Sequence, residues 1–300
     1  MPTELPVNET NRRTFLQSGA VVLAAMGLSL RESLAADSLN SPMLRFGLLT
    51  DIHYAEKDAA GDRFYQESLG KVNEAVDYFN QQNLPLAIEL GDLIDSADSL
   101  EKEVGHLRKI EDAYARFEGE RHYVLGNHCV HTLKKEEFLQ HTGMKAPHQS
   151  FDVGQFHFVI LDACYTSEGK SYGRGNFVWT DTNIPESQQK WLAEDLAKTH
   201  KPTLVFVHQR LDLDRPHHYA IGQSAAVRQI LENSKKVQAV FSGHSHANFH
   251  TSLQGIHYTV IRAVVTGSGQ SNNGYAVVNL FEDGSLKIEG KREQAAYSLT

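Results

Sequence analysis

The chain has 300 residues, 41% of them hydrophobic and 22% charged, so it has enough apolar side chains for a core and is not a disordered chain. Its 29 Lys and Arg against 37 Asp and Glu give a net charge of −8. This balance argues against nucleic acid or an anionic membrane as a partner, because both need a basic surface. Two cysteines exclude a disulfide scaffold and a four-cysteine zinc site. The 16 histidines favour a metal protein, since imidazole is the commonest metal ligand.

Residues 1–36 have the layout of a bacterial signal peptide. The pair Arg12-Arg13 precedes Thr14 to Leu30, which are 17 residues without a charge, and small residues follow at 33–36. Paired arginines followed by Thr-Phe-Leu resemble the twin-arginine export signal. An uncleaved membrane anchor is the alternative, but a bilayer span needs about 20 apolar residues. We expect an exported protein, periplasmic or extracellular, without stable membrane association after the signal is removed.

Short apolar runs alternate with amphipathic stretches along the rest of the chain. Strands are predicted at 44–50, 86–90, 122–125, 203–207 and 237–242, with two more inside 150–161. Helices are predicted at 64–82, 100–117, 184–200 and 223–233, and only strand-like segments follow residue 255. No linker or internal repeat interrupts this pattern. It indicates one α/β domain at 37–300, with a second sheet added to the first.

Polar residues gather directly after the predicted strands. In chain order, these residues are Asp51 and His53, Asp92 and Asp95, Asn127 and His128, His208, and finally His244 and His246. Sites in open α/β sheets form at the carboxyl ends of strands, so we expect these clusters to meet in one crevice. A glycine precedes Asp92, Asn127 and His244, which allows tight turns and close approach of the backbone.

The residue types in these clusters indicate a metal site. Carboxylate, imidazole and amide ligands suit manganese, iron or zinc. Seven candidate ligands are more than one tetrahedral ion needs. Two divalent ions that share one carboxylate, about 3.5–4 Å apart, are the simplest interpretation, and such pairs hydrolyse phosphate esters.

Together these motifs resemble the calcineurin-like metallophosphoesterase superfamily. They are Asp-x-His, Gly-Asp-x-x-Asp, Gly-Asn-His, a single His after an apolar strand, and Gly-His-x-His, spread over residues 51–246. The resemblance implies a sandwich of two mixed β-sheets flanked by helices, and a metal-bound hydroxide that attacks phosphorus. It implies one ion held by Asp51, His53, Asp92 and His246, and a second held by Asp92, Asn127, His208 and His244. It further implies a catalytic His128 that binds no metal, oriented by Asp95.

One departure from the family pattern narrows the resemblance. Cys129 stands where the family usually has an acidic residue, and Gly-Asn-His-Cys is similar to the manganese-dependent ADP-ribose/CDP-alcohol diphosphatases. The segments 158–163 and 188–192 are similar to that group as well, although the group often lacks the histidine found here as His53. Nucleotide-like diphosphates are therefore the favoured small-molecule substrates. The alternatives are a phosphomonoesterase or cyclic-nucleotide phosphodiesterase, and, less favoured, a non-catalytic metal-binding protein.

Other residues are candidates for substrate binding. Arg174 and Arg210 are candidate phosphate clamps. His217, His218 and Tyr219 follow the His208 strand and could contact substrate phosphate, and Trp179 lies with Tyr172 and Phe177 in a glycine-rich segment. Those aromatic residues could stack on a nucleobase or simply anchor the loop. Two further alternatives stay open, a Cys129–Cys164 disulfide and a role for Asp95 as a helix N-cap.

The export signal makes a direct prediction. Replacing Arg12 and Arg13 together by lysine keeps the charge and removes the twin-arginine signature. We expect the precursor to accumulate inside the cell, measured by fractionation and immunoblotting. Mature protein outside the cytoplasm at the normal level would instead indicate the general secretory route.

Overall fold

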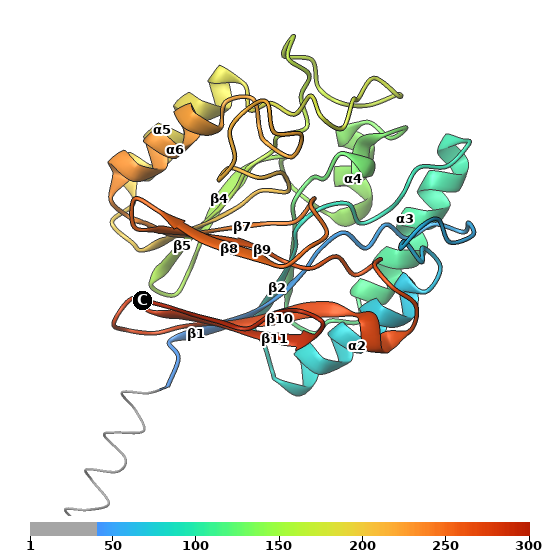
Figure 1. The fold of residues 1–300 in the computed structure, drawn as a ribbon, viewed down its shortest axis with the longest axis horizontal. Helices are drawn as coiled ribbons and strands as arrows, with labels where there is room; N and C mark the ends of the chain where they lie inside the picture. Colours follow the sequence, from blue (N-terminus) through green and yellow to red (C-terminus); the bar gives the residue numbers. More distant parts are fainter. Residues whose placement is uncertain (1–40) are drawn as a thin grey trace, which may run out of the picture. The chain divides into compact units, whose positions relative to one another are not determined.

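Two six-stranded β-sheets face each other in the computed structural model, which describes residues 41–300 (Figure 1). The predicted signal peptide at 1–36 lies outside the described residues. Residues 44–300 form one compact unit. Within the described part of the chain, no helix is long and apolar enough to cross a bilayer.

The first sheet has the strand order β12-β11-β10-β1-β2-β3. Its strands are β1 (Leu44–Leu49), β2 (Leu86–Glu89), β3 (Glu120–Tyr123), β10 (Gly274–Leu280), β11 (Leu286–Arg292) and β12 (Tyr297–Leu299). The first three strands run parallel, and β10 joins them by pairing antiparallel with β1. The strand-rich tail therefore completes the sheet that the first strand began.

The second sheet has the order β4-β5-β6-β7-β9-β8 and is also mixed. Its strands are β4 (Gln149–Val153), β5 (Phe156–Ile160), β6 (Thr203–Phe206), β7 (Val237–Ser242), β8 (Phe249–Leu253) and β9 (Ile256–Val260). Strands β5, β6, β7 and β9 are parallel, while β4 and β8 form antiparallel edges. The predicted pair of strands inside 150–161 is confirmed, whereas β8 was not predicted.

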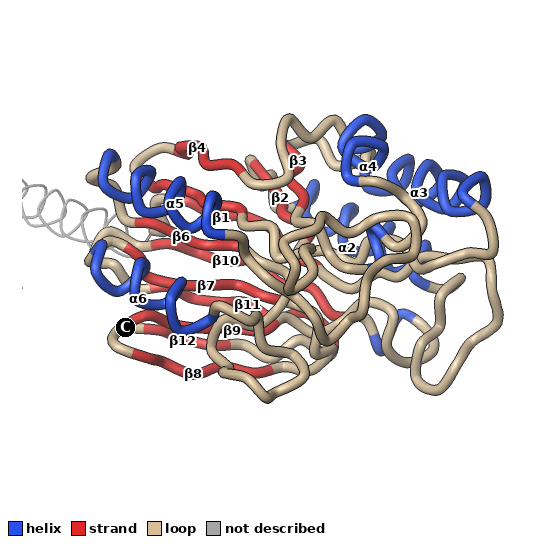
Figure 2. Tube along the Cα trace, turned by 90° about the horizontal axis from the view of Figure 1, so that it is seen from above, coloured by secondary structure: helices blue, strands red, loops and turns tan. Residues whose placement is uncertain are grey.

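Helices cover the outer faces of both sheets (Figures 1 and 2). They are α2 (Ser68–Gln81), α3 (Leu100–Tyr114), α4 (Lys135–Thr142), α5 (Glu186–Lys198) and α6 (Ser224–Ser234), with short 3₁₀ turns η1 (His128–Val130) and η2 (Gln270–Asn272). Helices α2 and α3 pack on the first sheet, and α5 and α6 pack on the second. The two mixed sheets flanked by helices confirm the predicted fold class.

Aromatic side chains fill the space between the sheets. The Phe46 ring on β1 meets the rings of Phe158, Phe206 and Phe241 edge-on, with centroids 5.3, 6.0 and 6.2 Å away. Phe206 stacks on both of its neighbours in the second sheet. Buried aromatic rings dominate the energetics of such cores, so this group fixes the two sheets relative to each other. The two sets of parallel strand ends are thereby held together.

Two helices differ from the sequence prediction in an informative way. The first helix begins at Ser68 and not at residue 64, because the Phe64 backbone N–H donates to Val265 O (2.9 Å) and ties this segment to a distant loop. Helix α4 was not predicted, since its sequence is mostly polar and only Phe138 and its neighbours anchor it. Both differences arise from tertiary contacts that local sequence patterns do not contain.

Candidate dimetal site

The predicted polar clusters meet at one end of the sandwich, where the parallel strands of both sheets finish. Asp51 follows β1, Asp92 follows β2, and Asn127 follows β3. From the second sheet, His208 follows β6 and His244 follows β7. His208 Nε2 lies 3.1 Å from Asp92 Oδ2, so residues 116 positions apart in the chain share one site. The convergence expected from the strand ends is therefore present.

One group of possible ligands consists of Asp51, His53 and His246, whose ligand atoms lie within 4.8 Å of one another. Asp51 Oδ1 is 3.1 Å from His246 Nε2 and 3.6 Å from His53 Nε2. The other oxygen, Oδ2, accepts hydrogen bonds from Thr50 Oγ1 (2.8 Å) and the His244 backbone N–H (2.9 Å). The protein thus fixes one carboxylate oxygen and leaves the other facing imidazoles, those of His53 and His246 and, at 3.9 Å, that of His208.

A second group consists of Asp92, His208 and His244. The His208 ring nitrogen Nδ1 donates to Leu90 O (2.8 Å), which leaves Nε2 as the free ligand atom. Asp92 Oδ1 accepts from the His128 backbone N–H (2.7 Å), while Oδ2 faces both His208 Nε2 and, at 3.5 Å, His53 Nε2. Asp92 Oδ2 therefore lies between the two groups, where a shared ligand must be.

The unpaired atoms in this region fit metal ligands. Asp51 Oδ1, His208 Nε2 and His244 Nε2 are buried and make no hydrogen bond within the described residues. A buried polar atom without a partner costs about 1–3 kcal/mol, so natural proteins rarely leave several of them together. Carboxylate and neutral imidazole are ligands for divalent manganese, iron and zinc. The donor set therefore fits divalent metal ions.

The charges in the site already attract cations. Burial alone would lower the pKa of His53, but Asp92 and Asp51 favour its charged form and raise this pKa to about 9. His208 behaves in the same way, and the carboxylates again raise its pKa to about 9. Burial and the neighbouring His208 charge lower the pKa of His244 to about 3, so this ring is neutral. Protonated imidazoles here compensate the same negative charge that metal ions neutralise.

The backbone is unusual at the ligand positions. Asp51, His53, Asp92, His244 and His246 all have a positive φ, between 44° and 67°. Non-glycine residues seldom adopt this region, and each such residue costs on the order of 1 kcal/mol or more. The left-handed turns end the strands abruptly and direct successive side chains into the site. Strain of this kind is typical of functional sites.

The predicted glycines make this crowding feasible. A Cβ atom on Gly126 would collide with the Asp92 backbone and carboxylate, and one on Gly243 would collide with Thr50 and Asp51. Gly91 has φ of 103° and leaves no space for a Cβ beside the His208 ring. The close backbone approach expected from the three glycines is confirmed.

His128 and Asp95 lie beside the ligand groups. His128 Nδ1 is 3.4 Å from Asp95 Oδ1, and its side chain remains one-fifth exposed. Asp95 Oδ2 also faces His53 Nδ1 at 3.2 Å, so one carboxylate contacts two histidines. Although burial opposes ionisation, hydrogen bonding to His128 and His53 holds the pKa of Asp95 well below its usual range. The N-cap of α3 is Ser99 and not Asp95, which removes the structural alternative for this residue.

A cavity of about 500 Å³ opens over these residues. Asp92, Asn127, His128, His244 and His246 form its base. Its walls come from loops and include Trp179 and Tyr219, both candidates from the sequence, together with Arg63, Asp62 and Ser245, which were not predicted. Trp179 and Tyr219 lie with their ring centroids 5.8 Å apart, and Trp179 is 43% exposed. Arg63 and Asp62 lie outside every motif, so only their tertiary placement identifies them.

The structure does not bring the other predicted substrate residues to the cavity. Arg174 forms a bidentate ion pair with Glu137, and Arg210 forms one with Asp212 while its guanidinium lies over the Phe249 ring. Both guanidinium groups therefore already have carboxylate partners. His217 and His218 are exposed on the loop before Tyr219 and do not line the cavity. Among the predicted aromatic residues, Tyr172 is buried and its hydroxyl donates to Asp181 O, which is a loop-anchoring role.

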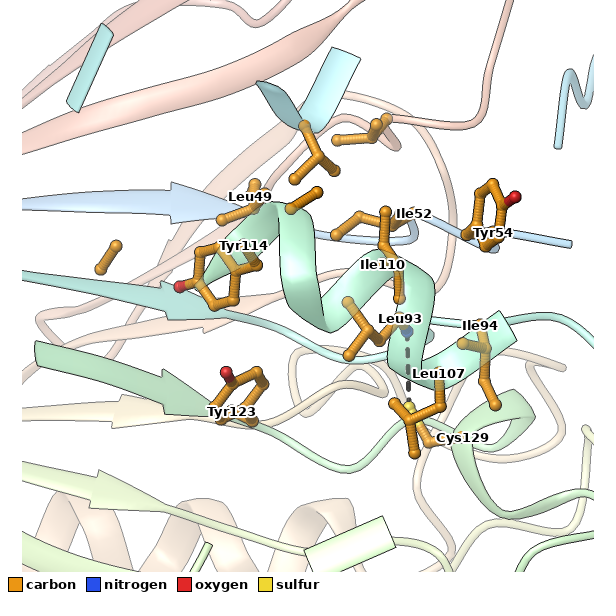
Figure 3. Packing of buried hydrophobic residues seen from close by; sticks show 14 of the residues in the cluster. Leu49, Ile52, Tyr54, Leu93, Ile94, Leu107, Ile110, Tyr114, Tyr123 and Cys129 are labelled. Carbon is orange, nitrogen blue, oxygen red and sulfur yellow. Dashed lines mark hydrogen bonds between the residues drawn. The ribbon is translucent and has the colours of Figure 1, made fainter. Parts of the chain in front are cut away.

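The two cysteines lie in the core behind the site and are both free. Cys129 Sγ accepts a hydrogen bond from the Leu93 backbone N–H (3.4 Å), directly after Asp92 (Figure 3). It packs with Leu107 and Ile94 beneath α3. Cys129 thus supports the Asp92 turn from the core side, and the alternative of a Cys129–Cys164 disulfide is wrong for this structure.

The fold and the site together define a dimetal phosphoesterase. The chain belongs to the calcineurin-like phosphoesterase family, whose profile matches residues 44–248. It is therefore a metal-dependent phosphohydrolase with two divalent ions as cofactors.

Known relatives agree with this assignment. Proteins named manganese-dependent ADP-ribose/CDP-alcohol diphosphatase from Oryza sativa subsp. japonica and Arabidopsis thaliana are 23% and 29% identical to this chain. The alignments cover 76% and 75% of this chain and 85% and 87% of those relatives. A dimetal phosphatase from Danio rerio has the same fold, with a TM-score of 0.76 and 20% identity over 87% of this chain and 99% of that one.

The close packing at Gly126 gives a prediction about metal binding. Gly126→Ala places a methyl group against Asp92, so the carboxylate must shift. We expect purified Gly126→Ala to bind clearly fewer than two manganese ions per chain, measured by elemental analysis after dialysis.

Gly105→Ala is the matched control, because a Cβ at this α3 position meets nothing within 4 Å. It should keep both ions and gain about 0.5–1 kcal/mol in the free energy of unfolding. Full metal content in Gly126→Ala would show that Asp92 tolerates displacement.

Proposed function

We propose that the protein hydrolyses nucleotide-like diphosphates of the ADP-ribose/CDP-alcohol type. The observation that carries the proposal is the cavity itself, whose base holds the ligand groups and whose wall presents the aromatic rings of Trp179 and Tyr219. Aromatic rings can stack on any nucleobase. A cavity volume of about 500 Å³ is in the range of small-molecule sites. The names of the plant relatives support the same substrate class.

The proposed ligand sets follow the two groups of side chains. One ion would be held by Asp51, His53, Asp92 and His246, and the other by Asp92, Asn127, His208 and His244. When bound, two divalent ions neutralise the charge on phosphate oxygens and activate water at neutral pH. Asp92 is the shared ligand because its Oδ2 faces one histidine of each group, at 3.1 and 3.5 Å.

We assign proton donation to His128. The ring lies at the base of the cavity, with its backbone fixed by Asp92 Oδ1 and its Nδ1 facing Asp95. An imidazole at this position can deliver a proton to a departing oxygen, and the neighbouring Asp95 carboxylate orients the ring. Asp95 is a positioning residue, and it acts on His53 as well as on His128.

The substrate class is tested by direct comparison of turnover. The manganese-loaded protein should have a higher kcat/KM for ADP-ribose and CDP-alcohols than for sugar phosphates and cyclic nucleotides. The aromatic wall gives a diphosphate with a nucleoside additional contacts that a simple monoester lacks. Trp179→Ala should remove about 1–3 kcal/mol of this preference, the usual value of one stacking contact. Faster hydrolysis of simple monoesters by the wild-type protein would favour the phosphomonoesterase alternative.

The role of His128 is tested by the choice of leaving group. His128→Asn should keep both metal ions and slow esters with alkyl or sugar leaving groups by roughly 10²–10⁴-fold. A nitrophenyl ester should slow noticeably less, because nitrophenolate departs without a proton. His131→Asn is the matched control, since this ring also packs on Phe177 but does not line the cavity. Equal slowing of all leaving groups by His128→Asn, or loss of an ion, would move the proton-donor role to another residue.

A further inference from the structure

Arg63 differs from the other arginines near the cavity because its charge is available to a ligand. It lines the cavity, and its side chain is 34% exposed. Within residues 41–300 its guanidinium makes a single ionic contact, at 3.7 Å from Nη1 to Asp95 Oδ2, which is too long for a good hydrogen bond. Among the described residues that line the cavity, Arg63 is the one arginine, and there is no lysine. A free guanidinium in a cavity is suited to bind phosphate in a bidentate manner.

The backbone around Arg63 is fixed before any ligand binds. Arg63 and Ala60 exchange two backbone hydrogen bonds, both 3.1 Å, which close a tight turn. On either side of Arg63, the Phe64 N–H donates to Val265 O (2.9 Å), and Asp62 O accepts from the Gly267 N–H (2.8 Å). The turn is therefore attached to the segment 262–267 at two points.

The segment 262–267 is itself joined to the metal site. The Val265 backbone N–H donates to Asp51 O (3.0 Å), and the Lys71 ammonium group bonds three carbonyl oxygens of the segment, those of Val264, Thr266 and Gly267. Arg63 and Asp51 are thus held by the same piece of backbone. A binding group fixed in this way loses little conformational freedom when a ligand arrives.

The position of Arg63 relative to Asp95 indicates which phosphate it meets. Asp95 Oδ2 lies between the Arg63 guanidinium and His53 Nδ1, at 3.7 and 3.2 Å. The Asp95 carboxylate therefore separates the guanidinium from His53, a proposed metal ligand. Arg63 lies next to the proposed metal site and is not part of it. In a diphosphate, the second phosphorus is one bridging oxygen away from the first, in a position to meet such a group.

We infer that Arg63 binds the second phosphate of a diphosphate substrate, the one that leaves, and so selects diphosphates over substrates with one phosphate. This inference rests on the proposed function, because it needs a substrate with two linked phosphates. Asp62 also reaches the cavity rim, and its carboxylate is suited to accept a sugar hydroxyl and not to bind phosphate.

The test compares two nucleotide substrates that differ in the second phosphate. ADP-ribose has it, and the nitrophenyl ester of thymidine monophosphate does not. With manganese bound, Arg63→Ala should lower kcat/KM for ADP-ribose by about 10–100-fold, the usual effect of losing a charge-assisted hydrogen-bonded pair. The nitrophenyl ester should change by less than about threefold. Arg63→Lys should fall between wild type and Arg63→Ala for ADP-ribose, because it keeps the charge without the planar fork.

Lys57→Ala is the matched control. Lys57 also contacts Asp95, at 2.8 Å, but it does not line the cavity. Neither the phosphate monoester that leaves ADP-ribose nor nitrophenolate needs a proton to depart, so an effect through Asp95 and His128 should change both substrates to a similar extent. This variant should therefore leave their ratio within about threefold of the wild-type value. An equal loss on both substrates in Arg63→Ala, or no loss on either, would overturn the inference. Manganese content of each variant shows that the site remains intact.

An inhibition experiment separates this inference from the proposed function. AMP and the methylene analogue of ADP differ by one phosphate, and both can compete with the nitrophenyl ester. The wild-type protein should bind the methylene analogue more tightly than AMP, and Arg63→Ala should lose this preference. If the wild-type protein fails to hydrolyse ADP-ribose, the proposed function is wrong, and the inhibition series still decides whether Arg63 recognises a second phosphate. Retention of the preference in Arg63→Ala would contradict the inference.

Discussion

The fully buried carboxylates Asp51 and Asp92 are the constraint on which the rest of the site depends. Two negative charges in a poorly hydrated region repel each other and lose their hydration, so they must be surrounded by positive charge. The histidines around them provide this charge when protonated, as the raised pKa values of His53 and His208 show. Divalent cations can take the place of these protons, because metal ligation needs the carboxylates ionised and the imidazoles neutral.

Holding these groups together requires a rigid scaffold. The left-handed backbone at Asp51, Asp92 and His244 is locally unfavourable and persists only where the surrounding structure determines it. The Phe46 ring and its partners fix the two sheets on one side, and Cys129 supports the Asp92 turn from the core. The glycines then remove the side chains that would prevent close approach. Stability in the core thus sustains strain in the site.

The base of the cavity and the wall candidates Trp179 and Tyr219 could be predicted from the sequence, and the Arg63 turn could not. Asp92 and His244 each come directly after an apolar strand and a glycine. This local pattern predicts both their place at a strand end and their role as metal ligands. Arg63 lies in a loop whose placement depends on distant segments, through the pairing of residues 62–64 with 265–267. Arg174 and Arg210 had suitable chemistry, but Glu137 and Asp212 already neutralise them. The residue types in the sequence indicate candidate substrate ligands. Only the tertiary contacts show which of these side chains have no protein partner and can bind a substrate.

In this fold, the metal ligands and the residues that contact the rest of the substrate come from different parts of the structure. The residues at the strand ends are coupled to one another through shared hydrogen bonds, so a change in one disturbs both metal positions. Trp179 lies on the loop between β5 and α5 and Tyr219 on the loop between β6 and α6, while the Arg63 turn is attached to the segment 262–267. None of these three wall residues belongs to the ligand groups. The ligand groups at the base of the cavity can therefore stay constant while the wall residues change. The choice of substrate then depends on wall side chains that belong to no motif.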